Sequence, residues 1–209
     1  MFDLQKYKEI KELLKKNSRN TTIIAVSKNH PETSIIQALK TGVNIFGENR
    51  VLEAKSKFEP LKKIYPNLEL HLTGPLQSNK VKDAAKLFDV FHTLDREKIA
   101  KEFNKNFDLI NNKKMFIQVN TGLEKTKSGI EPNKVSEFVK YCKNDMRLNI
   151  SGLMCIPPVD EDPNIHFRML KELLEKNNLQ ELSIGMSNDY TEAIKFKPSY
   201  IRIGTLIFG

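Results

Sequence analysis

Lys28 has a residue type and a position in this sequence that could support covalent chemistry. It follows an apolar run at residues 23–26 that is typical of a buried strand. Burial at the edge of a core lowers the pKa of a lysine, and the neutral amine forms a Schiff base with an aldehyde. We therefore expect a partly desolvated, nucleophilic Lys28. A lysine whose head group simply reaches solvent is the alternative, and the spacing alone favours it.

Two later strand ends carry residues suited to bind an anion. Gly185 and Gly204 let backbone N–H groups approach a ligand closely, and Ser187 and Thr205 add hydroxyl groups. Ser187 also precedes an expected short helix, and the N-terminus of a helix favours negative charge. These residues predict a phosphate site. In the alternative, which the residue types favour equally, Ser187 only caps the helix and Gly204 only turns the chain.

Arg202 is a candidate for a buried cation. It stands two residues before Gly204, so the two residues share one face of the last expected strand. That face points into the interior of a barrel or toward a ligand. A buried guanidinium needs a partner, because an unpaired charge in a core is costly. A structural ion pair with a carboxylate near the strand ends is therefore the alternative to a ligand contact.

Alternating strands and helices must position these residues. Between the strands, amphipathic stretches predict helices, for example at 2–17, 50–63 and 161–176, and Asp95 is the expected N-cap of another. Runs typical of strands occupy residues 23–26, 44–46, 68–72, 90–93, 115–119, 150–154, 182–184 and 200–203. Eight such units predict a single-domain (β/α)8 TIM barrel, whose sites lie at the carboxyl ends of the strands. An open doubly wound sheet is the alternative, but its GxGxxG fingerprint is missing.

The composition argues against several classes of protein. The chain has 209 residues, a formal net charge of +8 and 39% hydrophobic residues, which predicts a globular protein. Its lysines are mixed with glutamates on expected helix faces, unlike the concentrated basic stripe of a nucleic-acid-binding protein. No apolar run is long enough to span a membrane and residues 1–6 lack a signal-peptide pattern, so we expect a cytoplasmic protein. Cys142 and Cys155 lie in no metal-binding motif, so we expect reduced thiols and no metal.

Several short segments carry a recognisable pattern. They include AVSK at 25–28, FGEN at 46–49, HLTGPLQSNK at 71–80, IQVN at 117–120, KSG at 127–129, GLM at 152–154, LSIGMS at 182–187 and RIGT at 202–205. Over essentially the whole chain, their order and spacing resemble the pyridoxal phosphate homeostasis protein family, also called YggS/PROSC. The resemblance implies one domain over residues 1–209. That domain is the alanine racemase-like barrel of the fold-type III proteins that carry pyridoxal 5′-phosphate (PLP), without the C-terminal β-domain.

The resemblance also implies roles for individual residues. The cofactor-binding residues that it implies are Lys28, Asn49, Met186, Ser187, Arg202, Gly204 and Thr205. Lys28 would hold PLP as a covalent imine, the last two strand ends would bind the phosphate, and Arg202 would face the pyridine nitrogen. The sequence departs from the family's pattern at Arg50, Leu72 and Pro75. These departures affect the expected rim and not the implied cofactor.

The resemblance implies a protein that holds PLP rather than one that uses it for catalysis. A cationic Arg202 disfavours the protonated pyridine that PLP enzymes use as an electron sink. The tyrosine base of the resembling racemases comes from a further domain that we do not expect after Gly209. We therefore expect a monomeric PLP carrier in vitamin B6 homeostasis, with no catalytic residues, that delivers PLP transiently to apo-enzymes. A small amino-acid racemase of the same fold type is the alternative, and the sequence names no recipient enzyme.

Overall fold

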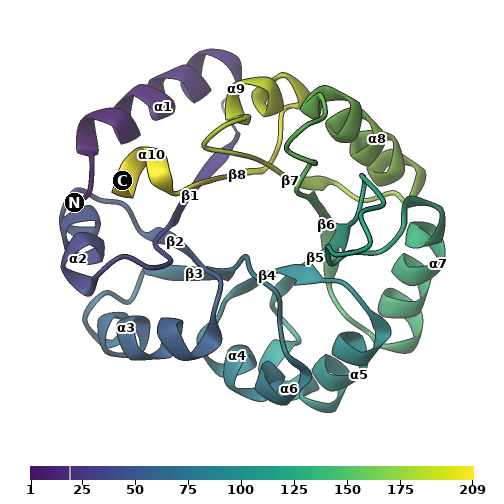
Figure 1. The fold of residues 1–209 in the computed structure, drawn as a ribbon. Helices are drawn as coiled ribbons and strands as arrows, with labels where there is room; N and C mark the ends of the chain where they lie inside the picture. Colours follow the sequence, from purple (N-terminus) through teal and green to yellow (C-terminus); the bar gives the residue numbers. More distant parts are fainter. Residues whose placement is uncertain (19) are drawn as a thin grey trace.

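Eight parallel strands form a closed barrel in the computed structural model, which describes residues 1–18 and 20–209 (Figure 1). Each strand pairs with the next along the chain, and β1 pairs with β8 to close the ring. The predicted (β/α)8 barrel is thereby confirmed. The strands are β1 (Thr22–Val26), β2 (Ile45–Glu48), β3 (Glu69–Leu72), β4 (Val90–Leu94), β5 (Lys114–Val119), β6 (Ile150–Cys155), β7 (Glu181–Met186) and β8 (Tyr200–Ile203).

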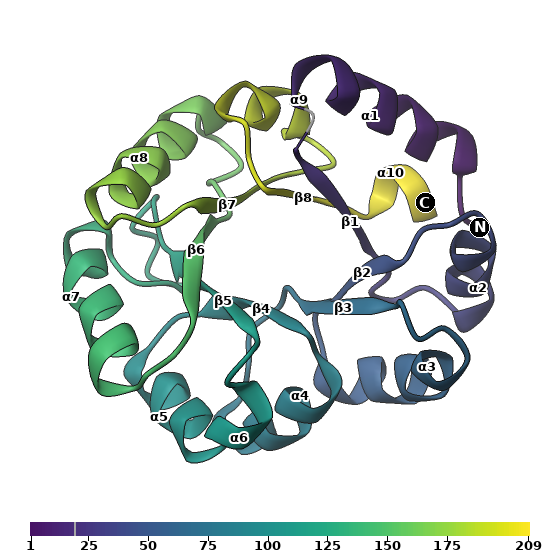
Figure 2. The same cartoon turned by 180° about the vertical axis from the view of Figure 1, so that it is seen from behind.

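Helices surround the strands in both views of the molecule (Figures 1 and 2). The α-helices are α1 (Leu4–Asn17), α2 (Glu32–Lys40), α3 (Val51–Ile64), α4 (Val81–Leu87), α5 (Glu97–Lys105), α6 (Phe107–Ile110), α7 (Val135–Lys140), α8 (Pro163–Lys176), α9 (Tyr190–Ala193) and α10 (Thr205–Phe208). Three 3-10 turns and one π-helical turn complete them: η1 (Ser78–Lys80), η2 (Pro132–Lys134), η3 (Tyr141–Asp145) and η4 (Ile194–Phe196). Within residues 1–18 and 20–209, no helix is long and apolar enough to cross a membrane.

The strands are buried on both of their faces. Side chains alternate along a strand, so one set points to the helices and the other fills the interior of the barrel. Most apolar side chains belong to one large core cluster, in which strand residues such as Phe46 and Leu70 pack against helices. Val90, Phe116 and Met154 form a separate small cluster, which we place in the interior of the barrel because their positions alternate with those of the large core. Polar side chains occupy much of the remaining interior.

Helix α1 covers the outside of the barrel where the last strand meets the first (Figures 1 and 2). The Asp3 carboxylate begins the helix by accepting a hydrogen bond from the Lys6 backbone N–H at 2.8 Å. The Asp3 N–H in turn donates to the Ile207 carbonyl oxygen in α10 at 2.8 Å. The Phe2 ring lies 5.5 Å from that of Phe208. The beginning of the chain thus packs against the segment that follows β8.

The structure differs from the sequence-based expectations at Asp95, in α6 and α10, and at the end of α7. Asp95 does not cap a helix, because α5 begins at Glu97 after Arg96, one residue too far along; the Asp95 carboxylate instead accepts a hydrogen bond from Arg96 at 2.5 Å. The short helices α6 and α10 were not predicted, since four residues are too few to show a helical period. The π-helical turn at the end of α7 was also missed.

Candidate functional site

A cavity of about 250 Å³ opens at the carboxyl ends of the barrel strands. All seven residues that were predicted as site residues line it. The full lining is Val26, Lys28, Asn49, Thr73, Ile156, Met186, Ser187, Asn188, Arg202, Gly204 and Thr205. Barrel closure brings the two ends of the chain together here, because the first strand pairs directly with the last. The cavity therefore lies where sites of this architecture are found.

Lys28 lies in the turn after β1 and not on the strand itself. Lys28 is largely exposed to solvent, although it lines the cavity. The expectation of a partly desolvated amine is therefore wrong for this structure, because β1 already ends at Val26 and Lys28 lies beyond the edge of the core. The next residue, Asn29, has a φ of 63°, a left-handed conformation that asparagine tolerates better than most residues. Its N–H donates to Glu53 Oε1 on α3 at 2.8 Å, which fixes the turn.

A buried ion pair lies directly behind this turn. Glu48, the last residue of β2, accepts a hydrogen bond from Ser27 Oγ at 2.8 Å and pairs with Lys57 Nζ of α3 at 2.6 Å. Lys57 also donates to the carbonyl oxygens of Ser27 and His30 and pairs with Glu53. Burial raises the pKa of Glu48, while Lys57 and Ser27 act in the opposite direction by stabilising the carboxylate. One ammonium group thus connects α3 to both sides of the turn.

The turn after β7 presents a hydroxyl group to the end of β8. Ser187 Oγ accepts a hydrogen bond from the Gly204 N–H at 3.4 Å. Gly185, the second-last residue of β7, has a φ of 87°, and a β-carbon there would lie 2.6 Å from a side chain of α9, so the close approach of the strand end to α9 requires glycine. The Asp189 carboxylate accepts a hydrogen bond from the Met186 N–H at 2.5 Å and holds the turn. Burial raises the pKa of Asp189.

The alternative reading of Ser187 as a helix cap is wrong. Helix α9 begins at Tyr190, and Asp189 is its N-cap. The Ser187 hydroxyl therefore contacts the end of β8 rather than the first turn of a helix.

Arg202 is buried in the barrel interior at the base of the cavity. Its Nη1 donates to the Ser183 carbonyl oxygen at 2.7 Å and to Ser183 Oγ at 2.8 Å, and its Nη2 donates to the Cys155 carbonyl oxygen at 2.9 Å. None of the ion pairs found in the described part of the chain includes Arg202. Burial lowers the pKa of the guanidinium, yet an arginine remains charged in a protein. A cation thus faces the cavity without a paired carboxylate.

Asn49 is held in place by residues that sequence reasoning did not assign to the site. Its Oδ1 accepts a hydrogen bond from Thr73 Oγ1 at 2.9 Å. Gly74 follows, and a β-carbon there would lie 2.5 Å from the Asn49 carbonyl oxygen, so only glycine allows this approach. Val26, Thr73, Ile156 and Asn188 were the lining residues that were missed. The strand-end position of Thr73 in the HLTGP segment was a signal that could have identified it.

The three departures from the family's pattern lie in different surroundings. Arg50 and Pro75 are exposed, and neither lines the cavity. Leu72 is fully buried in the large core cluster, so it does not belong to the rim at all. Its position at the end of β3 places its side chain on the face toward the helices.

The lining contains few groups that can change protonation. Lys28 and Arg202 are the ionisable side chains among the lining residues of the described chain, and no carboxylate, histidine, tyrosine or thiol joins them. An amine, three hydroxyl groups and a buried cation can together hold a small ligand that carries an aldehyde and an anionic group. Among residues 1–18 and 20–209, no group of three His, Cys, Asp or Glu side chains could hold a metal ion.

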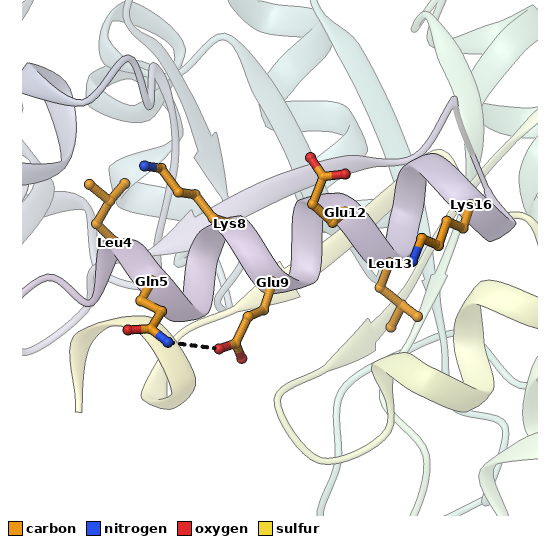
Figure 3. A pocket seen from close by; sticks show the side chains of 7 residues that line it. All are labelled: Leu4, Gln5, Lys8, Glu9, Glu12, Leu13 and Lys16. Carbon is orange, nitrogen blue, oxygen red and sulfur yellow. Dashed lines mark hydrogen bonds between the residues drawn. The ribbon is translucent and has the colours of Figure 1, made fainter.

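A second, wider hollow runs along the outer face of α1 (Figure 3). It is lined by Leu4, Gln5, Lys8, Glu9, Glu12, Leu13 and Lys16. All of these residues come from one exposed helix, and Gln5 Nε2 donates to Glu9 Oε1 at 3.4 Å (Figure 3). Binding sites usually combine polar groups that converge from several elements in a concave, partly apolar pocket. This hollow lacks that convergence, so the cavity at the strand ends is the candidate site.

Known protein families match the chain over nearly all of its length. The model of the alanine racemase N-terminal domain family matches residues 3–209. A pyridoxal phosphate homeostasis protein of Haemophilus influenzae is 38% identical over an alignment that covers 93% of this chain and 86% of that protein. A protein of the same name from Schizosaccharomyces pombe is 36% identical, with coverages of 92% and 85%.

Solved structures show the same architecture. PipY of Synechococcus elongatus PCC7942 without PLP matches with a TM-score of 0.86 at 32% identity, covering 97% of this chain and 99% of that chain. PipY with PLP bound matches with a TM-score of 0.83 at 31% identity, with coverages of 98% and 100%. Alanine racemase of Corynebacterium glutamicum matches with a TM-score of 0.71 at 17% identity and with 61% of its chain covered, a likeness of fold alone.

Proposed function

The chain belongs to the pyridoxal phosphate homeostasis protein family, within the alanine racemase N-terminal domain fold, and from this premise we propose that it binds PLP in the cavity at its strand ends. Residues 1–209 would act as one PLP-binding domain. The observation that carries the proposal is the convergence of Lys28, Ser187 and Arg202 on one small cavity. The PLP-bound structure of PipY, which is 31% identical, supports it.

The residues of the cavity fit the functional groups of PLP. Lys28 offers the amine for a Schiff base with the aldehyde, a condensation that releases water. Ser187, Gly204 and Thr205 offer hydroxyl and backbone N–H groups to the phosphate. The apolar side chains of Val26, Ile156 and Met186 offer surfaces for the ring. Bound PLP would supply a reactive aldehyde and an electron-accepting ring.

The charge of the site supports a carrier rather than an enzyme. We propose that Arg202 faces the pyridine nitrogen and Asn49 lies near the ring. A cation at that nitrogen opposes its protonation, which weakens the ring as an electron sink. Among the described lining residues no second base accompanies Lys28. The protein would thus hold, buffer and deliver PLP, as a cytoplasmic monomer that meets apo-enzymes transiently.

The covalent attachment is tested by trapping. PLP added to the purified protein should give an imine absorbance band that borohydride reduces to a stable adduct on Lys28, mapped by mass spectrometry. Lys28→Ala should lose the adduct. Lys80→Ala is the matched control, since Lys80 lies after β3 near the same end of the barrel but outside the lining, and it should retain the adduct. Unchanged PLP incorporation in Lys28→Ala would contradict the assignment.

The phosphate assignment is tested by comparing two ligands. Ser187→Ala removes a hydroxyl group that would donate to an anion, so PLP should bind about tenfold more weakly. Pyridoxal, which lacks the phosphate, should bind the unsubstituted protein and Ser187→Ala with equal affinity. Equal losses for both ligands would instead indicate that the substitution distorts the cavity as a whole.

The carrier proposal makes a third, separate claim about turnover. D- and L-amino acids incubated with the PLP-loaded protein should not interconvert catalytically, and an apo-enzyme added to the loaded protein should gain PLP. Sustained racemisation that is lost in Lys28→Ala would favour the racemase alternative.

A further inference from the structure

A continuous chain of hydrogen bonds crosses the interior of the barrel. Glu69 Oε1 and His71 Nε2 lie 2.6 Å apart, and His71 Nδ1 lies 2.8 Å from His92 Nε2. His92 Nδ1 lies 2.9 Å from Ser183 Oγ, which accepts from Arg202 Nη1 at 2.8 Å. The chain begins at the amino end of β3 and ends at the base of the cavity.

The middle of this chain is sealed from solvent. His71, His92 and Ser183 are completely buried, and Arg202 is 4% exposed. Only the Glu69 side chain, which is 41% exposed, reaches water. Burying a polar group destabilises a fold unless the group is hydrogen-bonded. In this chain every buried group makes its hydrogen bond.

The two ends of the chain determine the direction of every hydrogen bond. A guanidinium can only donate and an ionised carboxylate can only accept. Because Arg202 donates to Ser183 Oγ, the Ser183 hydroxyl is free to donate to His92 Nδ1. His92 then carries its proton on Nε2 and donates it to His71 Nδ1. His71 in turn carries its proton on Nε2 and donates it to Glu69 Oε1. In this arrangement each imidazole donates through Nε2 and accepts through Nδ1, and all the donors and acceptors match.

The opposite direction leaves a mismatch at the serine. If His71 and His92 carried their protons on Nδ1, the Ser183 oxygen would receive hydrogens from both His92 and Arg202. Its own hydroxyl hydrogen would then need another acceptor, and Glu69 would have to donate. The hydrogen bond from His71 holds the pKa of Glu69 below its usual range, which keeps the carboxylate an acceptor. Burial and the positive charge of Arg202 hold the pKa of His92 well below its usual range.

We infer that Arg202 is oriented for the cofactor by four positioning residues, namely Ser183, His92, His71 and Glu69. Arg202 lacks an ion pair, so the chain connects this buried cation to a carboxylate at the other end of the barrel. The hydrogen bonds that Arg202 donates to Ser183 and to the Cys155 carbonyl oxygen occupy three of its five N–H groups and fix the guanidinium, which leaves the Nε N–H and one Nη2 N–H for the cavity. This role toward the cofactor rests on the proposed PLP binding.

The remaining groups around the chain are compatible with this polarity. The Phe116 ring stacks on His92 at 4.6 Å with an interplanar angle of 4°, and Tyr200 meets both imidazoles edge-on. Near the Glu69 end, Lys114 pairs with Glu181 at 2.7 Å and acts on Glu69 only through its charge.

Few charged groups surround Arg202 at the cavity end of the chain. Asp189 and the Cys155 thiol influence Arg202 electrostatically, and neither pairs with it. Burial raises the pKa of Cys155 to about 12, so the thiol stays protonated. The hydrogen-bond chain is therefore the direct connection from Arg202 to a carboxylate.

Nitrogen-15 NMR of the cofactor-free protein tests the direction of the chain. At neutral pH His92 should be the neutral Nε2–H tautomer, and His71 should carry a proton on Nε2 with Nδ1 as an acceptor. In Glu69→Gln the amide can donate as well as accept, so the carboxylate end no longer excludes the Nδ1–H tautomer and a fraction of both rings should adopt it. Glu181→Gln, a matched change at the same end of the barrel and outside the chain, should leave both tautomers unchanged. An Nδ1–H tautomer of His92 in the unsubstituted protein, or unchanged rings in Glu69→Gln, would overturn the inference.

PLP titration tests the connection to the cofactor. Glu69→Gln should weaken PLP binding about three- to tenfold and shift the pH midpoint of the bound absorbance band, whereas Glu181→Gln should stay within about twofold. Ser183→Ala, which cuts the chain beside Arg202, should change the same midpoint. An unshifted midpoint in both variants would overturn the positioning role. If the unsubstituted protein bound no PLP, the proposed function would fail, while the tautomer result would stand independently.

Discussion

Lys57 shows how a residue outside the cavity can determine the position of one inside it. Its ammonium group pairs with buried Glu48 and holds the two carbonyl oxygens of the turn that carries Lys28. A buried carboxylate that loses its partner keeps the cost of its desolvation without the compensating attraction. The Lys57–Glu48 pair is therefore a sensitive point of the site.

We predict that Lys57→Met lowers the free energy of unfolding by about 3–5 kcal/mol at neutral pH. Burial already raises the pKa of Glu48, and loss of Lys57 raises it further. A carboxyl with a higher pKa in the folded chain takes up a proton on folding, so stability falls as the pH rises from about 4.3, the unfolded value, to the raised folded value. Denaturation curves over this range measure the slope.

A double substitution provides the control for this prediction. Glu48→Gln in the Lys57→Met background removes the titrating group, so the pH slope should disappear and much of the lost stability should return. A Lys57→Met protein whose stability did not depend on pH above the ordinary glutamate pKa would contradict the prediction.

The candidate site could be predicted at the residues that carry a visible motif and not at those that support them. Lys28 and Ser187 stand at strand ends, where residue type and position indicate a role in chemistry. Lys57 carries no such signal, because it is one helix lysine among many, and Glu48, although it stands at a strand end in the FGEN segment, meets Lys57 only after folding. The exposure of Lys28 agrees with the alternative that its spacing favoured, in which the head group reaches solvent.

The end of β7, with the turn that follows it, is the element whose geometry most directly shapes the anion side of the cavity. Gly185 has a φ of 87° and touches α9, so a β-carbon there would meet both backbone strain and a clash at 2.6 Å. Gly42 after α2 has nearly the same φ of 88°, but nothing lies within 4 Å of its β-carbon position. Substitution of Gly42 would therefore report backbone strain alone, whereas substitution of Gly185 would report strain together with steric overlap.

We predict that Gly185→Ala costs about 3 kcal/mol or more of unfolding free energy, because strain and overpacking add. Gly42→Ala should cost about 1 kcal/mol from strain alone. Gly185→Ala should also weaken PLP binding, since relief of the clash moves Ser187, whereas Gly42→Ala should not. Chemical denaturation and PLP titration measure both effects. Equal losses of stability in the two variants would show that α9 yields freely.

The strands and long helices were predicted because their patterns are local, while the exceptions depend on tertiary contacts. Strand β8 at Tyr200–Ile203 coincides with its prediction. The segment at 205–208 has an apolar composition that resembles a continued strand, yet it turns into α10 and packs on Phe2. Asp95 has the residue type of a cap but is drawn to Arg96 instead. The packing of α10 thus depends on Phe2, which is distant in the sequence, whereas the choice at Asp95 depends on its immediate neighbour Arg96.

The whole molecule closes through contacts between its two ends. The (β/α)8 pattern predicted the barrel, but it did not predict that α1 would cover the region where β8 meets β1. Ile10 and Leu14 of this helix are buried against the barrel, and the Asp3 N–H donates to the carbonyl oxygen of Ile207. Thr205 of the cavity lies in the same short helix as Ile207. The N-terminal helix therefore supports both the closure of the barrel and one wall of the cavity.

We predict that Ile10→Ala destabilises the entire barrel and not only the N-terminal helix. Removal of a fully buried isoleucine side chain costs about 2–5 kcal/mol, whereas Leu13→Ala on the half-buried side of the same helix should cost less. Because α1 joins the closure of a single barrel, far-ultraviolet circular dichroism and the bound-PLP absorbance should report one coincident transition in both variants. An early loss of helix signal with PLP still bound would show instead that α1 unfolds separately, and that the cavity wall at Thr205 does not depend on it.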